Sequence, residues 1–275
     1  MKLQVLVSAM HADAKELTNR MKLQTDAIII NQCDGIAAEQ FCIGDAEGNN
    51  REIKVYSFCE RGIGLSRNNA LLRASADISL FSDDDIIYED GYEKKIIDEF
   101  ASHPGADVLL FNVLVNEKRR TYYNTDFHRV RWYNCGRYPA YAIAIKTEQM
   151  HAKNLTFSLL FGGGAKYSNG EDSLFLVDCL KAGLKVYASP VLIGKEEERD
   201  SGSTWFSGYN RKFFYDRGVL YHYLYGKMAK VWGLRFLLKN KSAMCKEITF
   251  KQAYQWLKEG IRFAKNGKEQ GDEAS

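Results

Sequence analysis

Proline is scarce in this chain, with 3 residues in 275, so no proline-rich linker divides it. No segment approaches the roughly 18 consecutive apolar residues that a membrane-spanning helix needs. The 6 cysteines form no CxxC pair and lie mostly in apolar segments, so we expect buried thiols in a reducing cytoplasm and no disulfide framework. Hydrophobic residues at 45% and charged residues at 27% exclude a disordered or fibrous chain.

Net charge is also small, at +3, but it is unevenly distributed. Residues 211–246 contain nine Lys or Arg and one acid, so this segment carries +8 and the remainder carries −5. Such asymmetry favours an anionic partner. Because no nucleic-acid-binding motif accompanies the charge, we expect no nucleic-acid partner.

The same basic segment holds eight aromatic residues. At helical spacing it forms an apolar stripe of Leu220, Leu224, Met228, Val231 and Leu238. Arg235 falls within the stripe, and we expect Gly226 and Gly233 to interrupt the helix. Two interpretations fit equally well: a helix lying on an anionic membrane surface, and a helix packed on the protein body with its lysines in solvent.

Strands and helices are expected to alternate along the first 190 residues. Apolar runs predict strands at 3–8, 27–31, 54–58, 78–81, 108–111, 140–145 and 185–188. The segments between them predict helices, which indicates an α/β fold with a mostly parallel sheet flanked by helices. We expect a catalytic domain over 1–195, an aromatic and basic helical extension over 196–265, and a disordered tail over 266–275.

The strongest chemical signal is an apolar strand that ends in Asp83, Asp84 and Asp85. Adjacent carboxylates repel one another at a partly solvated sheet edge, and a divalent cation resolves that conflict. Hard oxygen ligands suit Mg²⁺ or Mn²⁺, and ligands of open α/β sheets bind beyond the carboxyl ends of strands. A solvated acidic turn is the alternative interpretation.

Glu171 and Asp172 follow Gly170 at the start of a helix expected over 171–182. Acids in a first helical turn interact favourably with the helix dipole, which alone explains their presence. The functional interpretation makes one of them a general base beside the triple Asp.

Residues 61–69 place two glycines and two arginines before a helix, where amides and arginines can face a phosphate or a base. The segment lacks the third glycine of a dinucleotide fingerprint and any Walker lysine, so neither motif is assigned. An ordinary turn with surface arginines remains the alternative. Asp34 follows the second strand, where it can accept hydrogen bonds from a base or ribose, although Asp-Gly is also a common turn.

Together these motifs resemble the family 2 glycosyltransferases, which have the GT-A fold. The resemblance covers residues 3–190 and rests on the strand 5–8, Asp34, the segments 64–68 and 81–85, and the segments 163–165 and 170–172.

The resemblance implies an inverting hexosyltransferase that takes its sugar from a nucleotide-sugar, usually a UDP-sugar. The acceptor would be a hydroxyl of a glycan or of a lipid-linked saccharide, as in the assembly of bacterial surface polysaccharides. This implies a cytoplasmic enzyme that is peripheral on the inner face of the membrane, where 211–246 would contact anionic lipid.

The site residues follow from the same resemblance. Those expected to bind the donor nucleotide are Ala9, His11, Asp34, Arg61, Arg67, Asp83 and Asp84. Asp83 and Asp85 would hold Mn²⁺ or Mg²⁺ on the diphosphate, with Asp84 as ligand if the register shifts by one. Asp172 matches the catalytic base, and Glu171 would support it. The acceptor region would comprise Gly162, Gly163, Gly164 and Trp132.

Two other classes of protein use similar elements. A sugar-nucleotide nucleotidyltransferase would need a glycine- and lysine-rich phosphate loop near the N-terminus, which residues 8–13 do not supply. A non-catalytic binding or scaffold protein on a degenerate transferase fold would have lost acids, whereas Asp83, Asp85 and Asp172 are all present.

Overall fold

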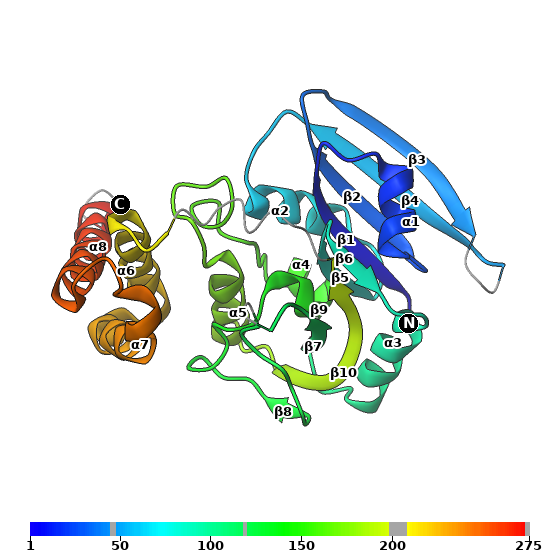
Figure 1. The fold of residues 1–275 in the computed structure, drawn as a ribbon. Coiled ribbons are helices and arrows are strands. Elements are labelled where there is room, and N and C mark those ends of the chain that lie inside the picture. Colours follow the sequence, from blue (N-terminus) through cyan, green and yellow to red (C-terminus); the bar gives the residue numbers. More distant parts are fainter. Residues whose placement is uncertain (45–47, 118–119, 198–207, 273–275) are drawn as a thin grey trace. The chain divides into compact units, whose positions relative to one another are not determined.

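The computed structural model describes residues 1–44, 48–117, 120–197 and 208–272 (Figure 1). The chain divides into two compact units. One unit comprises Met1–Leu159 and Glu171–Gly202, and the other comprises Leu160–Gly170 and Ser203–Ser275. The segment Leu160–Gly170 therefore groups with the C-terminal helices, which the sequence does not indicate.

Across the described residues, the first unit is built on a mixed sheet of ten strands (Figure 1). The strands are β1 (Leu3–Met10), β2 (Asp26–Gln32), β3 (Ala37–Gly44), β4 (Asn50–Phe58), β5 (Ile78–Asp83), β6 (Ile86–Tyr88), β7 (Val108–Leu114), β8 (His128–Arg129), β9 (Ile143–Lys146) and β10 (Val186–Glu196). Their order across the sheet is β3-β4-β2-β1-β5-β9-β7-β10-β6, and β8 pairs with β10. Because β4, β2, β1 and β5 are parallel neighbours, their carboxyl ends meet at one edge.

Helices cover both faces of this sheet. The helices are α1 (Ala14–Met21), α2 (Ile63–Arg73), α3 (Tyr92–Ser102), α4 (Thr147–Ala152) and α5 (Glu171–Lys181), with a 3₁₀ turn η1 (Ala140–Ala142). α1 and α3 join one core cluster with Val5 and Val7 of β1. α2 packs on β1 and β2 from the face of Leu6 and Ser8, since alternate strand residues point to opposite faces.

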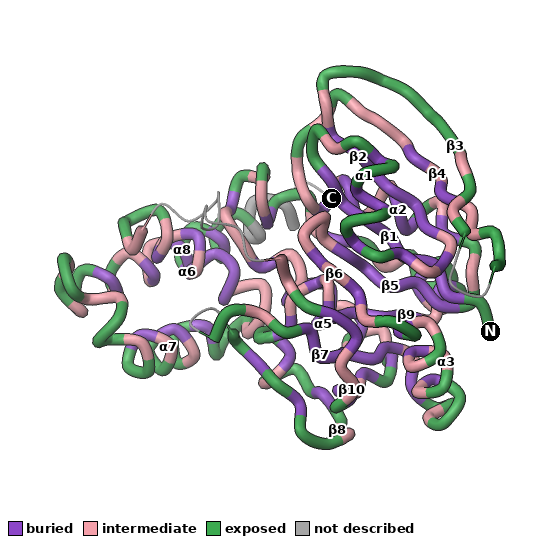
Figure 2. Tube along the Cα trace, turned by 45° about the vertical axis from the view of Figure 1, so that its right-hand side comes forward, coloured by how far each residue is buried: buried purple, intermediate pink, exposed green. Residues whose placement is uncertain are grey.

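The central strands are almost entirely buried, as continuous apolar runs predict, whereas the β3–β4 hairpin is largely exposed or intermediate (Figure 2). β3 is not predicted from the sequence, because its mixed and mostly exposed residues give no buried alternation. The expectation of buried cysteines is correct only for Cys135 and Cys179, since Cys42 and Cys59 are exposed.

The second unit contains α6 (Arg211–Tyr225), a 3₁₀ turn η2 (Gly226–Met228), α7 (Ala229–Met244) and α8 (Phe250–Asp272). α6 and α8 approach closely at glycines: a Cβ on Gly218 would lie 2.0 Å from the Leu257 carbonyl oxygen, and one on Gly260 2.1 Å from that of Tyr215. Gly226 ends α6 as expected, but Gly233 lies inside α7 against Leu257, so the expected second interruption is wrong. α8 also extends through most of the expected tail, and residues 273–275 lie outside the described residues.

The loop Leu160–Gly170 is tied to α6 by a buried carboxylate. Asp216 accepts hydrogen bonds from the Ser168 amide at 3.1 Å, the Ser168 hydroxyl at 3.0 Å and Lys212 Nζ at 2.6 Å. Lys212 Nζ also donates to the Lys166 carbonyl oxygen at 3.0 Å. The conformation of this glycine-rich loop therefore depends on the C-terminal helices.

Candidate active site

The carboxyl ends of β4, β2 and β1 bring His11, Asp34 and Arg61 together. Arg61 NH2 lies 3.0 Å from His11 Nε2 and 3.8 Å from Asp34 Oδ1, and His11 Nδ1 lies 3.9 Å from Asp34 Oδ2. These side chains are open to solvent, at 46% exposed for Arg61 and 89% for Asp34. An exposed group of donors and acceptors at this edge can face a base or ribose.

Two buried polar residues of β2 hold this edge in place. Asn31 accepts a hydrogen bond from the Ala12 amide and donates to the Ala12 carbonyl, both at 3.1 Å. Gln32 exchanges a similar pair with the Gly62 backbone. Ala9 is 4% exposed beside Asn31, and the next turn carries His11 at a φ of +47°, a conformation that costs energy for a non-glycine residue.

Asp83 is the last residue of β5, and Asp84 and Asp85 form the turn into β6. Asp83 points to the same sheet face as Phe81, two residues earlier, which is the face covered by α2 and α5. The turn is fixed by backbone hydrogen bonds: Arg20 donates to the Asp84 carbonyl at 3.1 Å, and the Glu197 amide donates to the Asp85 carbonyl at 2.7 Å.

Arg67 joins the two acidic motifs through Asp83 and Glu171, which lie 88 residues apart in the sequence. Its NH2 donates to Asp83 Oδ1 and its NH1 donates to Glu171 Oε1, both at 2.8 Å. The Arg67 side chain is 4% exposed and Glu171 12% exposed, while Asp83 retains 32% exposure. Burial alone lowers the pKa of Arg67, but the charges of its two partners outweigh this effect and raise that pKa.

The packing around Arg67 explains why these motifs meet. A Cβ on Gly64 would lie 2.4 Å from the Ser158 carbonyl oxygen, so only glycine lets α2 approach the segment that contains Ser158. Asn68 then pairs with the Phe157 backbone, donating to its carbonyl at 2.9 Å and accepting from its amide at 2.7 Å.

Three phenylalanines connect the acidic residues to this arrangement. Phe157 stacks on Phe175 of α5 with ring centroids 4.2 Å apart, and Phe81 of β5 meets both rings edge-on at 4.9 and 5.6 Å. Phe81 lies two residues before Asp83, and Phe175 lies three residues after Asp172. The aromatic cluster thus sets the separation between the two acidic motifs.

The pKa of Asp172 departs from the ordinary value of an aspartate. Burial raises the pKa of Asp172 from its ordinary value of 3.8 to about 7, and the charge of Glu171 adds to the rise. Arg67 and the hydrogen bonds from Ser173 partly offset it. A carboxylate whose pKa lies near neutrality is suited to accept and release a proton.

Trp132 lies in the turn that leads to Cys135. The Cys135 thiol donates to the Trp132 carbonyl at 3.4 Å. Burial raises the pKa of Cys135 to about 12, and the charge of Asp172 contributes to that rise. Trp132 is 49% exposed and its ring meets Tyr133 edge-on at 5.7 Å. An exposed aromatic side chain can stack against an acceptor.

The three expected acceptor glycines belong to the second unit. Gly162 donates its amide to the Tyr167 carbonyl at 2.9 Å, and Gly162 and Gly164 both adopt positive φ. Their role at the acceptor stays a prediction.

These residues can hold a divalent metal only if a substrate supplies further ligands to it. Among the residues that the structure describes, no group of three or more His, Cys, Asp or Glu side chains is arranged to bind a metal. One oxygen of Asp83 is already bonded to Arg67, so Asp85 and the second Asp83 oxygen supply few ligands. Because Mg²⁺ is commonly held by one or two carboxylates and substrate phosphates, this donor set suits a metal that arrives with a diphosphate.

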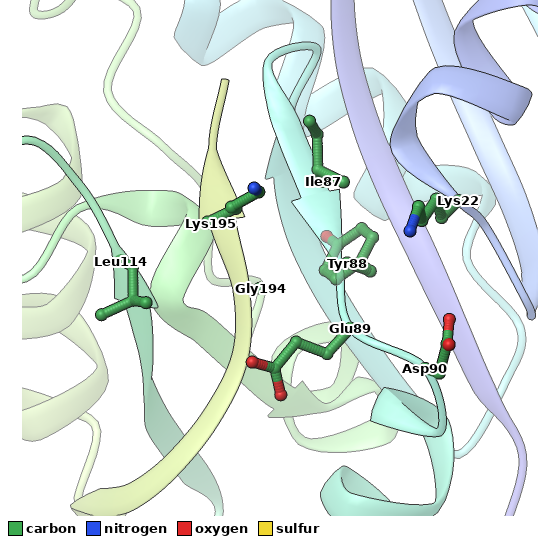
Figure 3. A pocket seen from close by; sticks show the side chains of 8 residues that line it. All are labelled: Lys22, Ile87, Tyr88, Glu89, Asp90, Leu114, Gly194 and Lys195. Carbon is green, nitrogen blue, oxygen red and sulfur yellow. The ribbon is translucent and has the colours of Figure 1, made fainter. Parts of the chain in front are cut away.

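A hollow of about 280 Å³ lies beside the paired strands β6 and β10 (Figure 3). Acidic Glu89 and Asp90 and basic Lys22 and Lys195 line it. None of its residues is an expected site residue, so this hollow does not mark the donor site.

Sequence reasoning assigns Arg67 to the nucleotide, whereas the structure pairs it with two carboxylates. The sequence also does not indicate the contacts of Asn31, Asn68 and Phe157, which hold the site residues in place. Asn68 lies in the motif 64–68, and this is the one signal in the sequence that indicates a contact of this kind.

Comparisons with known proteins concern the family and the fold of the chain. A sequence profile described as Glycosyl transferase family 2 matches residues 15–167. No curated protein sequence matches the chain.

Among solved structures, residues 1–349 of TarS from S. aureus in complex with UDP-GlcNAc match with a TM-score of 0.60 at 16% identity, covering 90% of this chain and 74% of that one. The same fragment in complex with UDP gives 0.58 at 14% identity, covering 93% and 78%. TarS itself gives 0.56 at 14% identity, covering 89% and 44%. At these identities the likeness shows the fold alone, and it confirms the expected GT-A architecture.

Proposed function

The chain belongs to glycosyl transferase family 2 and is a nucleotide-sugar glycosyltransferase, and we propose that it is a metal-assisted, inverting enzyme acting on a UDP-sugar. One observation carries the proposal. Arg67 bonds Asp83 and Glu171 at once, which brings the acids at the end of β5 and those at the start of α5 to one site. The donor can then bind at the acids of β5 while a proton is transferred at the acids of α5, within one site.

The donor nucleotide lies along the carboxyl ends of β4, β2 and β1. Asp34, Arg61 and His11 form the exposed group that meets the base and ribose. Ala9 provides a small surface beside them, and Asp83 and Asp84 follow on the neighbouring strand. The TarS structures with UDP and UDP-GlcNAc have the same fold, which supports a uridine nucleotide as the first donor to test.

The leaving group is a nucleoside diphosphate, whose developing charge must be stabilised. Asp85 and the free oxygen of Asp83 would hold Mn²⁺ or Mg²⁺, which supplies Lewis-acid stabilisation of that charge when bound. Arg67 cannot substitute for it directly, since its guanidinium donates to two carboxylates. Its role is to hold both acids in place.

Asp172 accepts the proton of the attacking acceptor hydroxyl, a function worth about 10²–10⁴ in rate. Glu171 holds the adjoining position through Arg67 and raises the basicity of Asp172 by repulsion. Attack opposite the departing diphosphate inverts the anomeric centre, by the geometry that governs inverting glycosidases.

The acceptor is a hydroxyl of a glycan or a lipid-linked saccharide, and the enzyme acts in the cytoplasm at the inner membrane face. The exposed Trp132 supports a sugar acceptor, because an exposed indole can cover the apolar face of a pyranose. By the family resemblance, Gly162, Gly163 and Gly164 stay candidates for acceptor binding.

Calorimetry with UDP tests the proposal. UDP should bind more tightly with Mn²⁺ than without, and UDP-sugars should raise the melting temperature more than other nucleotide-sugars. Binding of UDP that ignores metal would contradict metal assistance, and absence of any nucleotide binding would favour a scaffold. Consumption of a nucleoside triphosphate with a sugar phosphate would instead identify a nucleotidyltransferase.

A further inference from the structure

Helix α7 presents an apolar stripe on the side opposite to its packing contacts. Its buried residues, Ala229 and Leu237, face α6 and α8. Val231 and Leu238 are 57% and 60% exposed, and Leu234 is 36% exposed. These three positions, spaced by three and four residues, lie along one outward face of the helix. Figure 2 shows the alternation of buried and exposed residues along α7.

Basic residues border the stripe on both sides. From the helical period, Lys230 and Lys241 fall on one border, and Arg235 and Lys239 fall on the other. All four are exposed, and α7 contains no acidic residue. The four cations can therefore extend toward a surface while the apolar side chains between them enter it.

Aromatic residues mark one border of this face. Trp232 stacks on Tyr225 with ring centroids 4.9 Å apart, and the Arg235 guanidinium lies 5.1 Å from the Trp232 ring. Indole rings that are half apolar and half polar concentrate at the interface between lipid and water.

We propose that this face of α7, defined by Val231, Leu234, Leu238 and their four flanking cations, docks the protein in the interface of an anionic lipid bilayer. The charge pattern decides between occupants. A second copy of the chain would set the same cations against one another, and a nucleic acid has no use for the central apolar stripe. An anionic bilayer matches both parts.

This surface differs from the stripe expected from the sequence. That stripe runs through Leu220 and Leu224, but Leu220 is buried within α6, and Gly226 separates the two helices. The strongly exposed members of that stripe are Met228, Val231 and Leu238, and the last two lie on α7. No helix among the described residues is long and apolar enough to cross a bilayer.

Vesicle flotation of the full chain tests this inference, and its readout does not depend on sugar transfer. The protein should float with vesicles of phosphatidylcholine and phosphatidylglycerol but not with phosphatidylcholine alone. Val231→Ser with Leu238→Ser should weaken binding by about tenfold or more, because two inserted side chains are lost. Lys230→Gln with Lys241→Gln should weaken it by about 30-fold at low salt.

Matched controls are Leu72→Ser and Lys153→Gln, which remove an exposed leucine and an exposed lysine of the first unit and should bind as the unaltered protein does. Equal binding to both vesicle types, undiminished binding of either α7 variant, or no binding at all would overturn the proposal. Sedimentation velocity gives a further decision: self-association that Val231→Ser with Leu238→Ser abolishes would identify a second copy as the occupant and overturn the lipid assignment.

Discussion

Replacing Arg67 by methionine should damage both the stability and the pH profile of the enzyme. The change keeps most of the side-chain volume but leaves Asp83 and Glu171 without their shared cation. Removing one partner of a buried ion pair costs about 3–5 kcal/mol. Because Asp83 keeps 32% exposure, we expect the lower end, about 3 kcal/mol, in the free energy of unfolding measured with urea.

The pH dependence of turnover gives the second readout for Arg67→Met. Arg67 lowers the pKa of Asp172, so its removal should move that pKa above its value of about 7. The acidic limb of the kcat profile, which follows deprotonation of the base, should then shift to higher pH. Arg67→Met with Glu171→Gln should recover part of both losses, since it removes one orphaned carboxylate and its repulsion.

Arg73→Met is the matched control, because Arg73 lies on the same helix but stacks on Tyr56 and Phe58 away from the acids. It should leave the acidic limb where it is. An Arg67→Met protein with unchanged stability and an unchanged acidic limb would refute the idea that Arg67 couples the two acidic motifs.

The remaining predictions concern single positions. Asp172→Asn should keep UDP affinity while transfer falls by about 10²–10⁴, measured as UDP release; comparable turnover would remove Asp172 as base. In the unaltered protein, the free energy of unfolding should decline as pH rises from about 4 to about 7, because over that window the folded state keeps a proton on Asp172 that the unfolded state has released. Asp172→Asn should lose this decline. Asp85→Ala should weaken UDP binding by calorimetry only when Mn²⁺ is present, and equal losses with and without metal would count against ligation. Gly260→Val should lower the melting temperature, since its side chain would collide with the Tyr215 carbonyl, at a cost of about 1–3 kcal/mol; Gly267→Val, where a Cβ meets nothing, should not.

The sequence predicts the sheet and its acidic edge well because these features are local. Continuous apolar runs such as 27–31 announce buried parallel strands, and Asp83–Asp85 stand out against the strand they end. The α/β class follows from this order of elements, the GT-A architecture is what the family resemblance implies, and the comparisons confirm both.

Features that depend on contacts between distant segments are not predictable in this way. The sequence places Arg67 after a glycine turn, where it can face a phosphate or a base, and it gives no sign that folding brings Glu171 to within 2.8 Å of Arg67. Asp216 likewise resembles an isolated acid in a basic segment, although it orders the loop through Ser168. The stripe at 220–238 divides at Gly226 as its sequence predicts, but nothing in that sequence shows that Gly233 lies inside α7 against Leu257.

The first-formed anomer of the sugar released from a UDP-sugar tests the central claim most directly, because water can replace an unknown acceptor. With Mn²⁺, the unaltered protein should release from an α-linked donor a sugar that proton magnetic resonance first detects as the β anomer, and Asp172→Asn should release almost none. Release of the α anomer first, or undiminished release by Asp172→Asn, would contradict this account, in which the acids at the end of β5 bind the donor and Asp172 is the base of the same site.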